Sequence, residues 1–556
     1  MRIKPFQLLL LAIIGGCLMG FAFPFTGSLF FLAFIGVVPL ILINFELNQK
    51  IKHRFWKRFG LNYLYFLIYN VITTWWIYNA SPAGMYMAVL VNSLLMCIPL
   101  FLCGFISRKL GESKGLIALV ILWLSHEYGT YYGELSWPWL NFGHFFADSP
   151  KLIQWYEYSG VLGGTLWVLL VNVFIYIVLR NVWLRKESWK IQAPNFVMVG
   201  LSLAFPIICS LWMYHGYESQ NLNEDGDEEI INMVIVQPNI ESYTEKFRLP
   251  VNVQLAKMFN LAAQKMTPET DLVVFPETAI AYPMFENKPD NIDGSIIDDQ
   301  NSIISIKNFL LKKNNTPIMI GASTNRFFIK ENSVASTPTG KFFYENYNTA
   351  LIIQPNVPTQ IYHKAKPVLG GEKVPFLGWF PFLKAYSVEL GGTSGQIGPG
   401  SPIKCMEASG MKFTPMICYE SVYGEFVTYF TRSGADILCV ITNDGWWGDT
   451  PGYRQHCAFS QIRAIENRRP VVRSANTGIS CIIDDRGEIL QSVEWDKEGV
   501  MQADLPRNNE RTFYVKYGDL LGRVSLFLAI GLLIMAITAY VKSRGIPDTT
   551  DNNNSN

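Results

Sequence analysis

The stretch Phe413-Thr-Pro-Met-Ile-Cys-Tyr-Glu-Ser421 is typical of a short apolar strand that stops at a cysteine. A cysteine after an apolar run is usually a small core residue, as we expect for Cys439. Cys418 differs because the polar pair Tyr419 and Glu420 follows it at once. A cysteine held at the end of a buried strand can act as a nucleophile when a base or a cation lies beside it.

Two further predicted strand ends carry ionisable residues. Val273-Val-Phe-Pro-Glu-Thr-Ala279 presents Glu277 just past a proline. Tyr362-His-Lys-Ala-Lys-Pro-Val-Leu-Gly-Gly-Glu-Lys-Val-Pro375 carries Lys364 and Glu372 in a basic, glycine-containing loop. Taken singly, the first could be a helix-capping partner and the second a solvated surface loop. Taken with the cysteine, they indicate a site that pairs a nucleophile with a base and a cation.

These strand ends belong to a region, residues 229–510, in which short β-branched runs alternate with polar-apolar helices such as Val251–Lys265 and Tyr453–Asn467. This alternation predicts a layered α/β domain. The candidate strands are Ile231–Gln237, Leu272–Phe275, Pro317–Gly321, Ala350–Ile353, Lys412–Ile417, Ile437–Thr442, Val471–Ala475 and Ser480–Asp484.

The rest of the chain is too apolar for a soluble domain. Hydrophobic residues make up 50% and charged residues 16% of the 556 residues, whereas an average soluble domain is about 25% charged. At this length we expect at least two structural units. The formal net charge of +1 argues against a nucleic-acid partner, which a basic face would hold.

Cysteine and histidine positions give no sign of a metal or cofactor. The 9 cysteines contain no CxxC pair, and the 6 histidines form no HxxxH or Cys/His ligand pattern. We therefore expect no disulfide framework, no bound metal and no cofactor.

Eight segments are long enough to cross a membrane, which takes about 20 mostly apolar residues. Seven lie in residues 1–220 and one in 515–545, with a polar tail at 546–556. The first resembles a signal peptide, but another span follows at once and no clean cleavage site separates them, so we interpret it as a retained anchor. The predicted spans are Pro5–Phe25, Ser28–Phe45, Leu61–Asn79, Met85–Ile106, Leu116–Tyr132, Val161–Leu184, Phe196–Tyr217 and Leu520–Val541.

Basic residues alternate between successive loops and predict the orientation. Loops 25–27 and 80–84 carry no Lys or Arg, and residues 134–160 carry only Lys151. We therefore expect both termini in the cytoplasm of a bacterial inner membrane and residues 229–510 on its periplasmic side. The basic residues of the expected cytoplasmic segments are Arg2, Lys4, Lys50, Lys52, Arg54, Lys57, Arg58, Arg108, Lys109, Lys114, Arg180, Arg185, Lys186, Lys190, Lys542 and Arg544.

The third outer loop, Ser136-Trp-Pro-Trp-Leu-Asn-Phe-Gly-His-Phe-Phe146, is unusually aromatic. It could be an interfacial belt at headgroup depth, or a re-entrant segment that lines a lipid entry site. His126 and Glu127 form an ionisable pair in the fifth predicted span, where such groups are costly. Because the pair lies near the end of the span, we expect it to reach water.

Together these stretches resemble the nitrilase, or carbon-nitrogen hydrolase, superfamily, in which Glu, Lys and Cys follow in this chain order. Eight spans, with the α/β domain between the last two, narrow the resemblance to the apolipoprotein N-acyltransferases over nearly the whole chain. The supporting stretches are Val236-Gln-Pro-Asn-Ile240, Tyr347-Asn-Thr-Ala350, Thr442-Asn-Asp-Gly-Trp-Trp-Gly448, Arg463-Ala-Ile-Glu466, Arg468-Arg-Pro470 and Trp137-Pro-Trp-Leu-Asn-Phe-Gly143.

The resemblance implies a four-layer αββα sandwich beside the α-helical membrane domain. It also implies acyl transfer from a phospholipid to the N-terminal cysteine amine of a diacylglyceryl lipoprotein, through a cysteine thioester. In the implied roles, Glu277 is the general base, Cys418 the nucleophile and Lys364 the electrophilic stabiliser. Tyr419 completes the oxyanion hole through its main-chain N–H, Glu372 supports the lysine, and Tyr419 and Glu420 shape the pocket. Implied lipid or acceptor contacts are Trp137, Trp139, Phe247, Trp446 and Trp447.

The chain departs from the family pattern at two places. Lys366-Pro-Val-Leu-Gly-Gly-Glu372 replaces His-Leu-Val-Pro-Phe-Gly-Glu, so a second lysine lies close to Lys364. Lys246 or Phe247 takes the place of a tryptophan after the Gln-x-Asn motif.

Two other functions fit parts of the pattern. A membrane-anchored amidase could use the same three residues, although eight spans exceed what an anchor needs. A lipid-binding or transport protein could carry an inactive enzyme fold, but the intact Glu, Lys and Cys argue against it. The headgroup, the acyl chain, the acceptor lipoproteins and the oligomeric state are not predictable from these residues.

Overall fold

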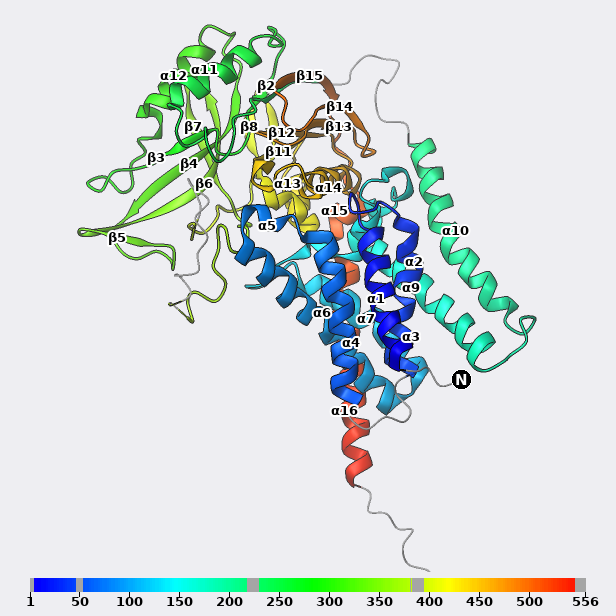
Figure 1. Cartoon of the computed structure of the whole chain (residues 1–556). Coiled ribbons are helices and arrows are strands. Elements are labelled where there is room, and N and C mark those ends of the chain that lie inside the picture. The colour runs from blue at the N-terminus through cyan, green and yellow to red at the C-terminus, as the bar shows by residue number, and fades with distance from the viewer. Residues whose placement is uncertain (1–4, 47–53, 218–229, 381, 383–394, 546–556) are drawn as a thin grey trace, which may run out of the picture.

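The computed structural model describes residues 5–46, 54–217, 230–380, 382 and 395–545. It has a bundle of long helices and an α/β part joined to one end of it (Figure 1). The predicted tail at 546–556 and the predicted boundary near residues 220–229 lie outside the described residues.

Long helices form the bundle: α1 (Pro5–Ala22), α4 (Arg54–Thr74), α6 (Pro82–Leu110), α7 (Glu112–Gly129), α9 (Val161–Leu179), α10 (Ala193–Gly216) and α16 (Leu520–Gly545). The C-terminal helix α16 packs against α6 and α7, so the two ends of the chain build one bundle (Figure 1). Within the described residues, five helical segments are long and apolar enough to cross a membrane: Pro5–Ala22, Pro82–Leu110, Val161–Leu184, Ala193–Gly216 and Leu520–Ser543.

The second predicted span is a shorter apolar helical segment, Phe30–Phe45, with a break inside it. Residues 28–45 break into η1 (Phe30–Leu32), α2 (Ala33–Gly36) and α3 (Val38–Glu46). At the break, the side-chain oxygen of Asn172 accepts the main-chain N–H groups of Val37 and Val38 at 2.9 and 3.0 Å. A side chain from α9 thus satisfies donors that a continuous helix would pair internally.

The third and fifth predicted spans are the helices α4 and α7, which are not among the five. The reason in α4 is a set of buried polar side chains, including Asn62, Asn70 and Thr73. α7 begins with Glu112 and holds the ionisable pair near its end. The count of eight spans therefore stays a prediction.

Glu127 does not reach water, contrary to the expectation. It is 2% exposed, and its carboxylate accepts the Trp123 indole N–H at 2.8 Å and the Thr165 hydroxyl at 2.5 Å. It also accepts the main-chain N–H of Phe142 at 2.9 Å. This buried polar group is satisfied by hydrogen bonds, and it ties the aromatic loop 136–146 into the bundle.

Two large sheets, and a further sheet of two strands, make up the α/β part within the described residues. The larger, eight-stranded sheet has the order β15-β1-β2-β4-β6-β5, with β3 beside β4 and β7 beside β6. The smaller, five-stranded sheet has the order β10-β11-β12-β13-β14. The strands are β1 (Ile230–Gln237), β2 (Leu272–Val274), β3 (Ile280–Phe285), β4 (Ile318–Phe328), β5 (Thr337–Thr339), β6 (Phe342–Gln354), β7 (Val357–His363), β10 (Met416–Ile417), β11 (Leu438–Thr442), β12 (Val471–Ala475), β13 (Ser480–Ile483), β14 (Ile489–Val493) and β15 (Gly499–Pro506).

Alternation along β1 shows how the layers stack. Val234 and Val236 belong to one core, with residues of α11 (Val251–Ala262) and α12 (Asn301–Leu310). Met233 and Ile235 belong to the other, with residues of the smaller sheet. Because successive side chains of a strand point to opposite faces, the larger sheet lies between a helical layer and the second sheet. α13 (Gly424–Arg432) and α14 (Pro451–Asn467) contribute to this second core. The predicted αββα sandwich is confirmed.

One predicted strand, Lys412–Ile417, is split into β9 (Met411–Phe413) and β10 (Met416–Ile417). Pro415 lies at the break and has no N–H to donate to a ladder. β9 pairs with β8 (Met406–Ala408), whereas β10 runs parallel to β11.

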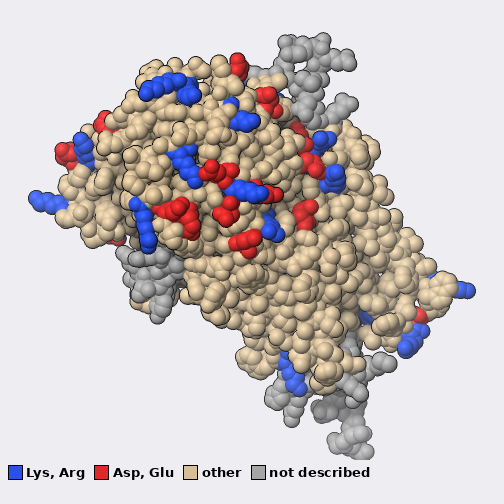
Figure 2. Space-filling model, turned by 45° about the horizontal axis from the view of Figure 1, so that its top comes forward, with Lys and Arg blue, Asp and Glu red and all other residues tan. Residues whose placement is uncertain are grey.

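Charged side chains are concentrated on the α/β part. Figure 2 shows Lys, Arg, Asp and Glu scattered over that face, above a lower body that is almost entirely free of charge. This division fits the five long apolar helices, because a surface in contact with lipid carries few charges.

Candidate active site

Cys418 lies in a strained turn at the end of β10. It begins the short helix η8 (Cys418–Val422) with a φ of 50°, a left-handed conformation that non-glycine residues rarely adopt. Its main-chain oxygen accepts the Ser421 hydroxyl at 2.9 Å and lies 3.1 Å from His456 Nε2. Backbone strain of this kind persists where the surroundings enforce it, often at functional sites.

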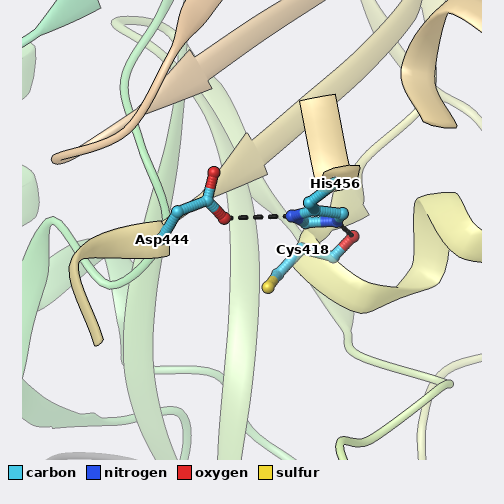
Figure 3. Close-up of side chains that lie close together, drawn as sticks. All are labelled: Cys418, Asp444 and His456. Carbon is cyan, nitrogen blue, oxygen red and sulfur yellow. Dashed lines mark hydrogen bonds and ion pairs between the residues drawn. The ribbon is translucent and has the colours of Figure 1, made fainter. Parts of the chain in front are cut away.

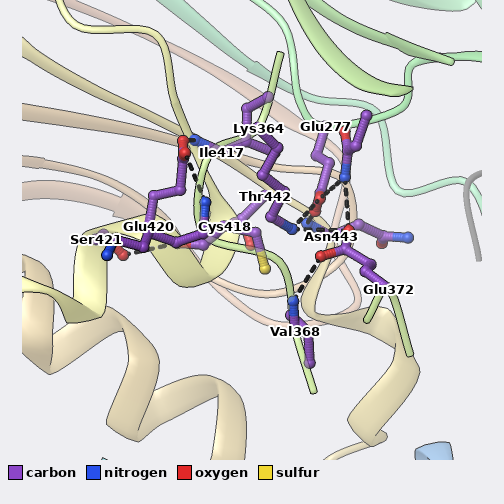
Figure 4. A network of polar contacts seen from close by, with 12 residues as sticks. Glu277, Lys364, Val368, Glu372, Ile417, Cys418, Glu420, Ser421, Thr442 and Asn443 are labelled. Carbon is purple, nitrogen blue, oxygen red and sulfur yellow. Dashed lines mark hydrogen bonds and ion pairs between the residues drawn. The ribbon is translucent and has the colours of Figure 1, made fainter. Parts of the chain in front are cut away.

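Glu277 follows β2 and faces the same space (Figure 4). One carboxylate oxygen accepts the Asn348 amide at 2.7 Å and lies 3.3 Å from Lys364 Nζ. The other accepts the main-chain N–H of Asn443 at 2.9 Å. These bonds fix the carboxylate in one orientation beside the lysine.

Lys364, at the end of β7, is 2% exposed and is shared between two carboxylates. Its Nζ donates to Glu372 Oε1 at 2.9 Å as well as to Glu277 (Figure 4). Burial lowers the pKa of Lys364, but Glu372 and Glu277 outweigh it, and the net pKa is raised. The lysine therefore stays an ammonium ion at physiological pH.

The second lysine of the loop lies elsewhere. Lys366 Nζ is 4.8 Å from the centre of the Tyr423 ring and 5.6 Å from that of Phe426. These are cation–π contacts, and none of the interactions of Lys366 in the described residues involves Glu277 or Glu372. The geometry thus agrees with the choice of Lys364.

Glu420 binds the lysine loop to the cysteine turn. Its carboxylate accepts the Tyr362 hydroxyl at 2.8 Å, the Ala365 N–H at 2.6 Å and the Ile417 N–H at 2.8 Å. Burial raises the pKa of Glu420 to about 7, although these hydrogen bonds oppose the rise.

The Cys418 thiol is 7% exposed and needs help to ionise. Burial raises its pKa, the negative charge of Glu277 adds to the rise, and Lys364 opposes it. A thiol in this state reacts only when a neighbouring base removes its proton during attack. Glu277, Lys364 and Cys418 come from three separate strand ends and lie together, an arrangement that can provide a base, a cation and a nucleophile for such a reaction.

A buried polar cluster behind the cysteine was not predicted from the sequence. His456 of α14 lies 3.0 Å from Asp444 (Figure 3). Asp444 also accepts a hydrogen bond from Arg473 Nη2 at 2.6 Å. Because the Cys418 carbonyl can only accept, its contact with His456 Nε2 requires a proton on that nitrogen. His456 Nδ1 lies 3.0 Å from Asp444 Oδ1 and 2.9 Å from Arg473 Nη2, so it donates to the carboxylate when the ring is protonated and accepts from the guanidinium when it is neutral.

Cys418, Asp444 and His456 bring possible metal-ligating atoms within 4.8 Å of one another. The donor set does not fit a cation well, because the Arg473 guanidinium already contacts both the carboxylate and the imidazole. We therefore interpret the cluster as a support for the strained Cys418 carbonyl.

Two family models match this chain. The carbon-nitrogen hydrolase model matches residues 234–514, which is half of the chain. The chain belongs to the carbon-nitrogen hydrolase family. The model of the apolipoprotein N-acyltransferase N-terminal domain matches residues 15–174, so the resemblance found in the sequence is confirmed for both parts.

Relatives of this carbon-nitrogen hydrolase family member match it over nearly its whole length. An apolipoprotein N-acyltransferase of Chlorobaculum tepidum is 29% identical over 97% of this chain and 97% of the relative. One of Geobacter metallireducens is 26% identical over 92% of this chain and 91% of the relative. A solved structure of a carbon-nitrogen hydrolase from Helicobacter pylori is 18% identical, with a TM-score of 0.35, over 53% of this chain and 99% of that one.

The aromatic loop of the helical part reaches the carbon-nitrogen hydrolase site. The Tyr419 ring stacks on Trp137 and Trp139, with ring centres 6.1 and 6.3 Å apart. Trp139 is 1% exposed, and its indole N–H donates to Gln455 of α14 at 2.9 Å. The loop is therefore buried at the junction of the two parts, which corrects the interfacial-belt interpretation.

The two tryptophans of η9 (Asp444–Trp447) have different surroundings. Trp446 stacks on Phe247, with ring centres 6.3 Å apart. Trp447 packs against Trp76 and Trp139, at 4.8 and 5.9 Å. Trp446 and Phe247 thus adjoin the β1–α11 loop, whereas Trp447 joins the aromatic cluster of the junction.

Proposed function

We propose that this chain transfers an acyl chain from a phospholipid to the N-terminal cysteine amine of a diacylglyceryl lipoprotein. One observation carries the proposal: the residue after the cysteine stacks on two tryptophans of the helical part. A nucleophile placed at such a junction can meet a lipid ester, whereas a hydrolase of small soluble amides has no use for this contact. The two family matches on one chain support the same conclusion.

In the first half-reaction, Glu277 takes the proton of the Cys418 thiol as the sulfur attacks the phospholipid ester carbonyl. A tetrahedral oxyanion forms, stabilised by the Lys364 ammonium and the main-chain N–H of Tyr419. Its collapse breaks the ester C–O bond, and the leaving alkoxide takes the proton from Glu277. The products are a Cys418 thioester and a lysophospholipid.

In the second half-reaction, the amine of the acceptor attacks the thioester carbonyl and Glu277 takes a proton from it. The same donors stabilise the second oxyanion. The C–S bond breaks, the amide is released, and the Cys418 sulfur regains a proton from Glu277. Glu372 keeps Lys364 in place through both steps, because it holds the ammonium at 2.9 Å.

We further propose that the eight predicted segments span a bacterial inner membrane and hold residues 229–510 on the periplasmic side. The alternation of basic loops supports this orientation. Trp446, Phe247 and Trp137 would then line the way by which lipid or acceptor arrives, whereas Trp139 and Trp447 belong to the packed aromatic cluster of the junction. Phospholipid as the donor fits a site next to long apolar helices.

The test uses full-length protein and a phospholipid with a radiolabelled acyl chain. Without acceptor, we expect hydroxylamine-sensitive label on the protein and release of lysophospholipid. Addition of a diacylglyceryl-cysteine peptide should move the label to the peptide as an amide. Cys418→Ala should abolish both steps, and Cys439→Ala, at a buried cysteine of β11, is the matched control.

The alternatives give different results. A membrane-anchored amidase would hydrolyse small amides and leave the peptide unlabelled. A lipid-binding protein would retain phospholipid without a covalent bond. Label on the Cys418→Ala protein equal to that of the wild type would overturn the thioester mechanism.

A further inference from the structure

Lys246 is a buried lysine to which the proposed mechanism assigns no role. It lies between β1 and α11 and is 2% exposed. Its Nζ donates to the main-chain oxygen of Glu277 at 3.1 Å. In the amide orientation that pairs its oxygen with donors, Asn443 Oδ1 also lies 3.1 Å from this nitrogen. Lys246 thus contacts Glu277 itself and Asn443, whose main-chain N–H holds the Glu277 carboxylate.

The titratable groups that face Lys246 are those of the reaction. Lys246 contacts Glu277, at the end of β2, through its main-chain oxygen, and the charges of Glu277 and of Cys418, in the turn after β10, both act on the lysine. α11 contributes the uncharged Gln254, whose amide donates to the Lys246 main-chain oxygen at 2.9 Å. Burial lowers the pKa of Lys246 to about 8, while Glu277 and Cys418 oppose the fall.

A count of charges shows what this lysine supplies. Glu277 and Glu372 are two carboxylates that share the single ammonium of Lys364. With the thiol neutral, these three groups carry one net negative charge. A second ammonium at Lys246 balances that charge, and a nearby positive charge favours the thiolate over the thiol.

We propose that Lys246 is a positioning residue that, as a second buried ammonium, fixes Glu277 and stabilises the Cys418 thiolate. The acyl donor and acceptor in this inference rest on the proposed function, but the effect on the thiol does not. A merely structural lysine would act through its hydrogen bond to Glu277. A lysine that acts by its charge must also lose its effect when it loses its proton.

The experiment measures alkylation of Cys418 by iodoacetamide, across pH 6 to 10, in the full-length protein by peptide mass spectrometry. Lys246→Gln keeps a donor for the Glu277 oxygen but removes the charge, Lys246→Met removes both, and Lys246→Arg keeps the charge. Lys257→Gln, at a half-exposed lysine of α11, is the control. Alkylation of the buried Cys439 in the same samples reports unfolding.

We expect Lys246→Gln and Lys246→Met to slow alkylation of Cys418 at pH 7.5 about tenfold, since a nearby charge shifts a pKa by about one unit or more. The wild-type rate should rise more slowly with pH above about 8, where Lys246 loses its proton, and the Gln variant should lack this break. A Gln variant with the wild-type rate and profile overturns the proposal. If the wild type is not labelled by phospholipid, the proposed function is contradicted, but the alkylation measurement still tests the role of Lys246.

Discussion

Glu420 accepts the main-chain N–H of Ala365 at 2.6 Å, so a carboxylate of the nucleophile turn holds the lysine loop. Its second oxygen accepts the N–H of Ile417, directly before Cys418. The spacing between Lys364 and Cys418 therefore depends on this carboxylate as well as on the sheets.

Replacement of Glu420 should slow the reaction, although this residue takes no part in the proposed chemical steps. Glu420→Gln presents an N–H₂ group to one of these N–H donors and leaves it unpaired, at a cost of about 1–3 kcal/mol. We expect a loss of at least tenfold in thioester formation, measured in single turnover. Unchanged turnover in this variant would show that the bridge does not set the site.

Replacement of Lys364 should slow acylation far more than replacement of Lys366, the second lysine of the loop. Lys364→Met removes the ammonium that lies between Glu277 and Glu372, and we expect acylation to slow by about 10²–10³, as for the loss of one oxyanion donor. Lys366→Met removes cation–π contacts with Tyr423 and Phe426 and should retain most of the rate. A dead Lys366 variant beside an active Lys364 variant would reverse the assignment.

Loss of His456 should affect the cysteine through its carbonyl. His456→Phe keeps a ring in the same space but removes the Nε2 donor 3.1 Å from Cys418 O. Residues held in such a backbone conformation store about 1–3 kcal/mol, so the turn should relax and acylation should slow by tenfold or more. The rate of thioester formation measures this, and a wild-type rate would rule out the support that we ascribe to the imidazole.

Replacement of each of the two adjacent tryptophans should have a different effect. Trp447→Ala opens a cavity between Trp76 and Trp139 and should lower the melting temperature, because loss of a packed aromatic costs about 3–5 kcal/mol. Trp446→Ala removes a stacking contact with Phe247 and should weaken lipid turnover more than stability. Equal loss of stability in both would contradict this division.

The orientation can be tested with reporter fusions. The alternation of Lys and Arg in the loops places Gly226 outside the cytoplasm and Lys542 inside it. A reporter that works only outside the cytoplasm should therefore be active after Gly226, and a reporter that works only inside should be active after Lys542. Alkaline phosphatase and green fluorescent protein fusions measure the two sides. The opposite result at either point would reject the eight-span arrangement.

The strand ends were good predictors of the site because of sheet geometry. Residues after neighbouring strands meet at one edge of a sheet, and two facing sheets bring such edges together. Glu277 and Cys418 each end an apolar run in the sequence, and Lys364 opens a basic, glycine-containing loop, so these patterns depend only on local residues. Their convergence therefore followed from the order of the strands.

The residues that were missed depend on tertiary packing. His456 and Arg473 lie on α14 and β12, and nothing in either segment indicates that they contact each other or that His456 reaches the Cys418 carbonyl. The break in the second span is similar, since Asn172 is far away in the sequence and reaches the two N–H groups only once α9 has packed. Hydropathy measures a segment alone and does not register such a partner.

The pairing of β15 with β1 has a consequence for the order of synthesis. Ile230 at the start of β1 pairs with Pro506 at the end of β15, and the final membrane-spanning candidate α16 begins soon afterwards. During translation β1 therefore waits as an open edge, prone to pairing with other chains, until β15 at residues 499–506 has emerged. Closure of the larger sheet and entry of α16 into the bilayer become neighbouring events, so a ribosome that stalls late in the message would release a chain that lacks both.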